Sequence, residues 1–230
     1  MSQGFIELVR RGSTKEIAEW VEDDPQIATS RDARGVSALM WAVYSGQTLV
    51  REFLLSGLPD LDLAECAAVG NCARLSELLN GDAAKAKSTS PDGWPLLHLA
   101  AAFGTPEAVA LLLLNGADVH QVADTPMRNQ ALHAALALGR EQETVRMLLE
   151  HGADPNAPQM GGFRPLHQAA AAGRLDLVQQ LLEAGADPAL LCDRGKSAAD
   201  YARERAHPSV VGLLESWPPH HPSASDTSSP

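Results

Sequence analysis

Three histidines recur along the sequence at a nearly constant spacing, and histidine is a common ligand of zinc. His98, His133 and His167 lie 35 and 34 residues apart. Nitrogens bound to one zinc ion sit about 2.0–2.1 Å from the metal and so within roughly 3.5 Å of one another. Neighbouring helices, in contrast, pack about 8–10 Å apart. Histidines from successive repeats therefore cannot readily share an ion, and the spacing predicts a structural role and no metal site.

The other residues that could do chemistry fit no reactive pattern. Cys66 and Cys72 lie close together and Cys192 is distant, which matches no zinc or redox motif. We expect buried, unreactive thiols. Acidic pairs such as Asp23 with Asp24 fall at turns, where solvation accounts for them. Because the sequence also has no GxSxG, no phosphate-binding glycine loop and no dinucleotide fingerprint, we expect no catalytic residue, no cofactor and no enzyme activity.

Composition narrows the class of partner. The chain of 230 residues has 29 acidic and 18 basic side chains and a net charge of −11. This charge repels phosphate backbones and anionic lipid surfaces, and no apolar run approaches the roughly 20 residues of a membrane span. Three cysteines, an odd number, argue against a secreted disulfide framework. We expect a cytoplasmic monomer that binds neither nucleic acid nor membrane.

The histidines belong to blocks that repeat along the chain. They lie within LLHLAA, ALHAAL and PLHQAA, and six residues later a glycine follows each of them, at Gly104, Gly139 and Gly173. Each block then runs through paired leucines to the same Gly-Ala-Asp turn. A fixed period of this length indicates stacked helical repeats. We expect each of these glycines to end a helix in a left-handed turn.

These motifs resemble the ankyrin repeat, whose period is about 33 residues and whose signature is TPLHxA. Worn copies appear in GVSALMWAVYSG, AECAAVG, GKSAADYARERAHP and the segment 5–24. The resemblance implies an all-α solenoid of about seven helix pairs with β-hairpin fingers, spanning residues 1–217, with capping first and last pairs. The chain is similar to short, stand-alone bacterial ankyrin arrays. The resemblance also implies that each histidine hydrogen-bonds its own finger, and the Pro- and Ser-rich residues 218–230 are expected to be a disordered tail.

The physics of the blocks agrees with the resemblance. Each block contains a short Ala-rich segment and a Leu-rich segment, which is too little to bury an apolar face alone, so stacking must build one continuous core. We expect Leu112 and Leu181 to be core residues, with Trp41 facing the core between repeats.

Two departures from the period predict local differences. Gly46 to Gly70 spans 24 residues, whereas Gly70 to Gly104 spans 34. The third pair has therefore lost its finger, and we expect a notch in the row of fingers there. Conversely, the finger before His133 carries two extra residues.

In the family that the chain resembles, partners contact the finger tips and the exposed end of each first helix. Aromatic, Met and Arg side chains at such positions are typical of interface hot spots. An alternative stays open, in which the aromatic side chains pack within the array. The positions of this chain that match are Arg34, Tyr44, Trp94, Phe103, Met127, Arg128, Leu138, Met160 and Phe163.

The sequence thus predicts a non-catalytic protein–protein interaction module that uses a concave groove and its finger tips. The anchors would be Tyr44, Trp94, Phe103 and Phe163. Arg128 stands where a finger glycine is usual. The alternative is a regulatory inhibitor that occludes the active site of a partner enzyme, with the longer finger at 124–129 as the inserted element.

Overall fold

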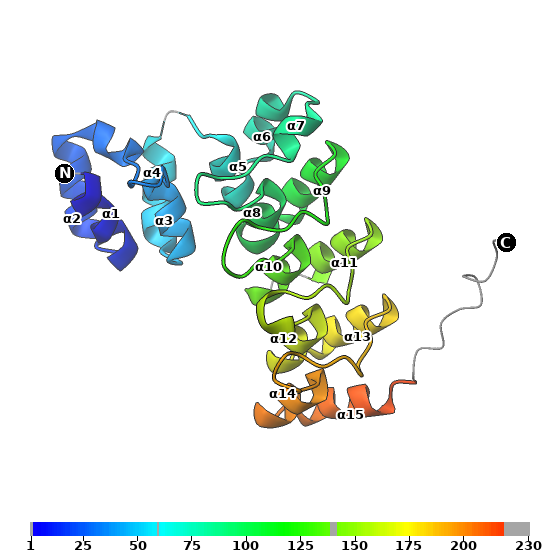
Figure 1. Cartoon of the computed structure of the whole chain (residues 1–230). Coiled ribbons are helices and arrows are strands. Elements are labelled where there is room, and N and C mark those ends of the chain that lie inside the picture. The colour runs from blue at the N-terminus through cyan, green and yellow to red at the C-terminus, as the bar shows by residue number, and fades with distance from the viewer. Residues whose placement is uncertain (1, 59, 139–141, 219–230) are drawn as a thin grey trace.

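The computed structural model describes residues 2–58, 60–138 and 142–218, and within them the chain forms seven antiparallel helix pairs (Figure 1). The predicted all-α solenoid is confirmed. Two 3₁₀ turns, η1 (Pro25–Thr29) and η2 (Met160–Gly162), and a short helix α7 (Ala83–Ala86) lie between pairs. The pairs, in chain order, are α1 (Ser2–Arg11) with α2 (Thr14–Asp23), α3 (Ala38–Tyr44) with α4 (Thr48–Gly57), α5 (Leu63–Val69) with α6 (Cys72–Leu79), α8 (Leu96–Phe103) with α9 (Pro106–Leu114), α10 (Ala131–Ala137) with α11 (Gln142–Glu150), α12 (Pro165–Ala171) with α13 (Leu175–Glu183), and α14 (Ala198–Glu204) with α15 (Pro208–Ser216). Of the tail expected at 218–230, all but the first residue lies outside the described part.

Local chemistry starts and stops these helices. The Thr105 hydroxyl accepts a hydrogen bond from the Ala108 N–H, and Pro106 occupies the first turn of α9, where its missing N–H costs nothing. Gly173 has φ = +69°, as expected for a left-handed helix end. Gly104 does not: its φ is −80°. Glycine is needed there because a Cβ would lie 2.3 Å from the Ala67 carbonyl oxygen of the neighbouring pair. Gly139 is outside the described residues.

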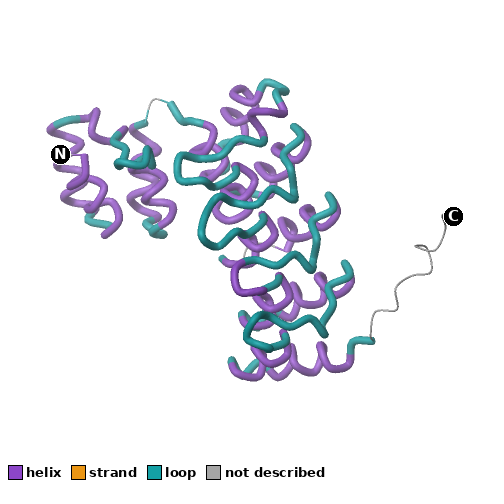
Figure 2. Tube along the Cα trace, viewed as in Figure 1, coloured by secondary structure: helices purple, strands orange, loops and turns teal. Residues whose placement is uncertain are grey.

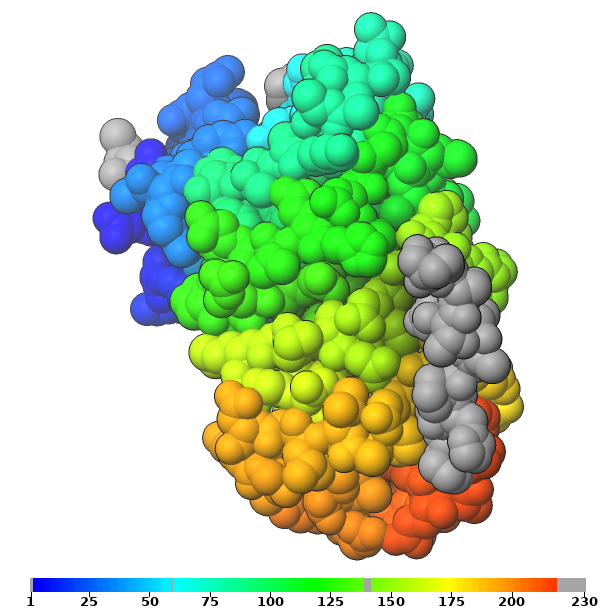
Figure 3. Space-filling view, turned by 45° about the vertical axis from the view of Figure 1, so that its right-hand side comes forward, coloured from blue at the N-terminus to red at the C-terminus, as the bar shows by residue number. Residues whose placement is uncertain are grey.

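One continuous core runs the length of the array. First helices contribute small side chains such as Ala101 and Ala135, and second helices contribute leucines. Leu112 and Leu181 are fully buried, as expected. In the space-filling view the pairs from α5 onward form successive bands in contact with one another (Figure 3). Each pair is therefore stabilised chiefly by its neighbours.

The fingers are hairpins without β-strands. Figure 2 shows them as loops between helix pairs, and in the described residues only isolated bridges form, Arg31 with Ser37 and Thr89 with Pro95. This corrects the expected β-hairpins, because each arm is too short to build a ladder. In each finger one backbone N–H donates to a carbonyl across the turn, at 2.8–3.0 Å. The bonded residues are Asp32 and Val36, Ser90 and Trp94, Ala123 and Asn129, Gln159 and Phe163, and Cys192 and Lys196.

We number each finger by the helix pair that follows it. The fifth finger has the two extra residues that the sequence predicts, since its closing bond spans 123–129, whereas the neighbouring fingers close over 90–94 and 159–163. Successive finger tips are also bonded to one another. The amide N–H groups of Asp124, Met160 and Asp193 donate to the carbonyls of Gly93, Met127 and Gly161, at 3.0, 2.9 and 3.0 Å. The fingers from the fourth pair onward therefore form one bonded row.

Two of the three repeated histidines, His98 and His167, connect one finger to the next, whereas the buried Nε2 of His133 has no hydrogen-bond partner among the described residues. His167 Nδ1 accepts from the Arg164 N–H of its own finger at 3.2 Å, and its Nε2 lies 3.1 Å from the Lys196 carbonyl of the following finger. His98 Nε2 reaches the Asn129 carbonyl at 2.9 Å in the same way. Because a carbonyl only accepts, Nε2 carries the proton. The expected bond to the histidine's own finger is thus half of its role.

His98 lacks the other half of this arrangement. Its Nδ1 is buried and has no hydrogen-bond partner among the described residues. The position that donates to Nδ1 elsewhere, Gln130 or Arg164, is Pro95 here, and proline has no N–H.

The missing third finger changes the direction of stacking. Figure 1 shows α1 to α4 standing beside the column formed by α5 to α15, instead of continuing it. The expected notch is absent. A Cβ on Gly35 in the second finger would lie 3.2 Å from Pro91 in the fourth, and the Tyr44 hydroxyl donates to Asp92 at 3.3 Å. The second and fourth fingers have therefore closed over the deletion.

The unpartnered His98 nitrogen generates a prediction about stability. Pro95→Thr supplies an N–H to Nδ1, and satisfying a buried polar atom is worth about 1–3 kcal/mol, against about 0.4–1 kcal/mol lost with the rigid proline. We expect the free energy of unfolding, measured in urea, to rise. Pro106→Ala is the control, because it removes a helix-start proline without offering a donor to a histidine, and should lower stability. A fall for both variants would contradict this account of His98.

Buried histidines also predict a pH dependence. Burial lowers the pKa of His98 and of His133 to about 4 and lowers the pKa of His167. In the unfolded chain the histidine pKa is near 6.5, so these side chains bind protons that they do not bind in the folded chain. The free energy of unfolding is therefore highest above pH 6.5 and falls as the pH decreases towards 4. We expect a loss of about 1 kcal/mol for each of His98 and His133 between pH 7 and 5.6. His98→Gln should flatten this slope, and equal stability at both pH values would contradict it.

Candidate functional site

The predicted contact positions separate into two groups by exposure. Exposed side chains belong to Arg34, Met127, Arg128, Leu138 and Met160. The four aromatic anchors, Tyr44, Trp94, Phe103 and Phe163, are half-buried.

Tyr44 and Phe103 meet on the finger side of the array, although a whole pair separates them in sequence. Their ring centroids are 5.5 Å apart. Together with Val43, Ala102 and Leu138 they line a pocket of about 200 Å³, which we call the front pocket and which Gly46 and Arg51 complete. Leu138 is 53% exposed at its rim. Most of the pocket wall is apolar, Arg51 contributes a charged side chain, and the walls come from pairs two, four and five.

Sequence reasoning missed Arg51. It lies on α4, a second helix, whereas the family's contact positions lie on first helices and fingers. The displacement of the second pair brings a second-helix residue to the front pocket. The short spacing from Gly46 to Gly70 signals the missing finger in the sequence, but it does not show which residues the displacement brings together.

Hydrogen bonds fix the orientation of Tyr44. Its hydroxyl donates to Asp92, which also accepts from the Ser90 hydroxyl at 2.7 Å. Burial, and then the nearby Asp92 carboxylate, raises the pKa of Tyr44 far above its usual range. The phenol therefore stays protonated and presents a fixed ring face to the front pocket.

Trp94 and Phe163 pack within the array. The Trp94 ring lies edge-on to His98 with centroids 6.4 Å apart, and Phe163 lies 5.3 Å from His167 and 5.1 Å from Tyr201 of the last pair. These contacts support the alternative that these two aromatic side chains secure the stacking of repeats.

Trp41 is not the core residue that we expected. It is half-buried, its indole N–H donates to Asp32 at 3.1 Å, and the guanidinium groups of Arg10 and Arg34 lie 4.6 and 5.7 Å from the ring centroid. Arg34 is thus held over an aromatic face beside the second finger.

The tip of the fifth finger carries further predicted contact residues, Met127 and Arg128. Arg128 adopts φ = +48°, a left-handed conformation that Gly93 provides in the fourth finger and Gly195 in the seventh. Met127 beside it is 40% exposed, and Met160 on the next finger tip is 55% exposed. The carbonyl of Met127 accepts from the amide of Met160, so the two exposed thioethers belong to adjacent, bonded tips.

Other chemistry finds little support in the described part of the chain. Cys66 and Cys192 are buried and Cys72 half-buried, and burial raises the pKa of Cys66 to about 12. The described residues contain no group of three or more His, Cys, Asp or Glu that could hold a metal ion. Among the helices described, none has the length and apolar content to cross a bilayer.

Comparison with known proteins identifies the repeat. A model of ankyrin repeats (3 copies) matches residues 63–159, and a model of ankyrin repeats (many copies) matches residues 148–202. The mouse B-cell lymphoma 3 protein homolog is 36% identical over 123 residues, 54% of this chain and 26% of that protein. Mouse ankyrin repeat and SOCS box protein 16 is 42% identical over 113 residues, 46% of this chain and 24% of that protein. A putative ankyrin repeat-containing protein of Treponema pallidum is 36% identical over 124 residues, 53% of this chain and 40% of that protein.

The chain therefore matches only a quarter to two fifths of the length of these relatives, and what they share with it is the repeat. The repeated histidines, the row of bonded fingers and both family models agree: the chain belongs to the ankyrin-repeat family.

Proposed function

We propose that this protein binds a partner protein through its finger side, without catalysing a reaction. The observation that supports this most is the front pocket, which is mostly apolar, draws on three helix pairs and leaves Leu138 half exposed. Stacking does not require an exposed leucine at this position. Partner contact would bury it and exclude water from the two aromatic rings.

The family supports the same proposal. Ankyrin repeats are generally protein–protein interaction modules, and the family is generally non-catalytic. Met127, Arg128 and Met160 are exposed at the finger tips, and their side-chain types are common at interfaces.

The character of the partner and its setting are part of the proposal. A net charge of −11 favours a protein over a nucleic acid or an anionic membrane. The three cysteines are all free thiols, which fits a reducing cytoplasm. We infer that the protein is a monomer there until its partner binds.

The inhibitor alternative depends on the fifth finger entering an active site. That finger is bonded on both sides, through the Asp124 N–H to Gly93 and through the Met127 carbonyl to Met160. Bonds of this kind hold the finger within the row, and so favour a broad contact across the finger side over insertion of a single loop.

Alanine at Leu138 tests the front pocket. A hot-spot side chain contributes about 2 kcal/mol or more, so Leu138→Ala should weaken partner binding roughly 30-fold. Leu114→Ala is the matched control, because Leu114 is 81% exposed on a second helix and should leave binding unchanged. The partner is obtained by affinity purification from the native cell, and binding is then measured by titration with the purified partner.

Folding must be separated from binding in that experiment. Leu181→Ala serves as the core control, with an expected loss of about 2–5 kcal/mol of stability. The proposal would be wrong if Leu138→Ala melted as early as Leu181→Ala, or bound as tightly as Leu114→Ala.

Arg128 supplies an independent test at the finger tips. A non-glycine residue in the left-handed region costs about 1–2 kcal/mol, so Arg128→Gly should stabilise the fold by about 1 kcal/mol while weakening partner binding. Arg128→Ala should weaken binding equally with no gain in stability, because alanine keeps the backbone cost. Unchanged binding in both variants would remove Arg128 from the interface.

A further inference from the structure

The junction between the second and third pairs differs from the other junctions in the array. On one side of it stand α1 to α4, and on the other stands the column from α5 to α15 (Figure 1). The contacts across this junction are unevenly distributed between the finger side and the opposite side, which we call the back.

The finger side of the junction is held by polar and aromatic contacts. Arg31 on the second finger lies 2.9 Å from the Asp62 carboxylate and 3.5 Å from that of Glu65, both at the start of α5. Tyr44 contacts Asp92 and Phe103 of the fourth pair. α3 also packs against α5.

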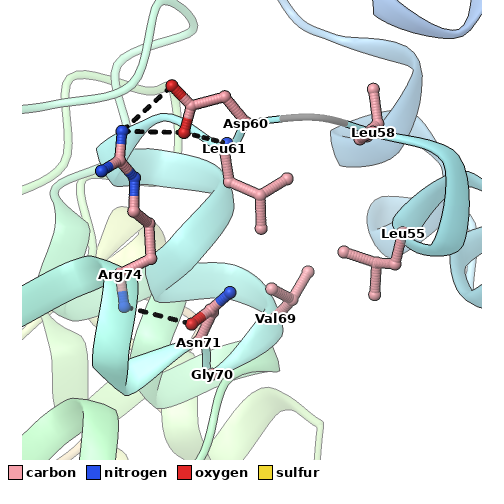
Figure 4. Close-up of a pocket in the computed structure, with 8 residues that line it drawn as sticks. All are labelled: Leu55, Leu58, Asp60, Leu61, Val69, Gly70, Asn71 and Arg74. Atoms are coloured by element: carbon pink, nitrogen blue, oxygen red, sulfur yellow. Dashed lines mark hydrogen bonds and ion pairs between the residues drawn. The ribbon is translucent and has the colours of Figure 1, made fainter.

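The back of the junction is open. Helices α4 and α6 are almost out of contact, whereas the second helices of the other neighbouring pairs pack together. Between them lies a cleft of about 470 Å³, which we call the back cleft (Figure 4). Leu55 and Leu58 face it from α4 and its end, and Val69, Leu61 and Arg74 face it from the third pair.

The turn glycines show that this junction also differs at the turn between the two helices of a pair. A Cβ added to Gly12, Gly70 or Gly173 would meet the residue that caps the next pair's second helix, within 2.2 to 2.5 Å. A Cβ added to Gly46 would meet nothing within 4 Å. At this junction alone among those compared, the end of one pair does not touch the start of the next second helix.

A junction connected along one edge and open along the other can rotate about the connected edge. Closing the back cleft would bury more of Leu55, Leu58 and Val69, which favours closure. Closure would also strain the contacts of Tyr44 with Asp92 and Phe103. These contributions oppose each other, and motion between packed blocks about a few connecting residues is a common form of hinge.

We propose that the junction between the second and third pairs is a hinge, and that a partner bound at the front pocket fixes its angle. Tyr44 and Arg51 belong to one block, and Phe103 and Leu138 belong to the other. Rotation at the junction therefore changes the shape of the front pocket. The regulatory part of this inference depends on the proposed function, whereas the hinge itself does not.

The test measures the spread of distances across the junction in the free protein. Two cysteines, Lys15→Cys on α2 and Gln179→Cys on α13, are introduced with Cys72→Ala and spin-labelled, and the distance distribution is measured by pulsed electron resonance. Lys15 and Gln179 are both exposed. The control pair, Glu107→Cys on α9 with Gln179→Cys, lies within the second block.

We expect the distribution across the junction to be about twofold broader than the control or to have two maxima, and saturating partner to narrow it. Inserting a copy of residues 155–163 between Asp60 and Leu61 restores a finger to the third pair and should narrow the distribution without partner. If this insertion variant does not fold, the comparison between the two label pairs still tests whether the junction is a hinge.

The possible failures are distinct. Equal widths for the two label pairs would overturn the hinge, whether or not a partner binds. A broad distribution that partner binding leaves unchanged would overturn the regulation while retaining the hinge. Loss of the proposed function would appear separately, as partner binding that Leu138→Ala and Arg128→Ala do not weaken.

Discussion

Burial of apolar side chains between neighbouring pairs is the interaction on which the rest of this structure depends. No pair contains enough apolar surface to fold alone, so Leu112 and Leu181 are buried only because another pair covers them. Side-chain burial is non-directional, however, and does not fix the register of one pair on the next. The histidines and fingers supply that direction, because His98 and His167 each reach one particular carbonyl on the following finger.

The fingers act as spacers as well as connections. Where they follow one another, their tips are bonded and the pairs stack in a column. Where one is missing, Gly35 comes against Pro91 and the pairs on either side tilt together. Since the helices are rigid, closure on the finger side requires separation on the back, between α4 and α6. A deletion in a loop thus becomes a change in the direction of the whole array.

Much of this fold could be predicted from sequence, because the period fixes which residues are equivalent. Equivalence predicted the helix pairs, the core leucines and the extra length of the fifth finger. It failed where a residue's environment depends on a neighbour that breaks the period. Gly104 is required by the close approach of the Ala67 carbonyl and not by its own φ, and Trp41 lies beneath Arg10 and not in the core. Neither contact can be read from the sequence of a single repeat.

The same reasoning explains why the candidate site was only partly predictable. Position in the repeat identifies Tyr44, Trp94, Phe103 and Phe163 as equivalent candidates. Trp94, however, packs against His98, and Phe163 packs against His167 and Tyr201. Tyr44 and Phe103 differ because the missing finger brings them together over the third pair.

Because the missing finger brings Tyr44 and Phe103 together across a junction, the geometry of that junction affects the affinity for a partner. A surface built across a junction costs free energy to hold in one arrangement, so the fraction of molecules already in the binding arrangement multiplies the intrinsic affinity. The bond from Tyr44 to Asp92 raises that fraction, because it holds the second pair against the fourth before any partner arrives. The loss of one finger therefore both creates the front pocket and makes its shape depend on the angle between the two blocks.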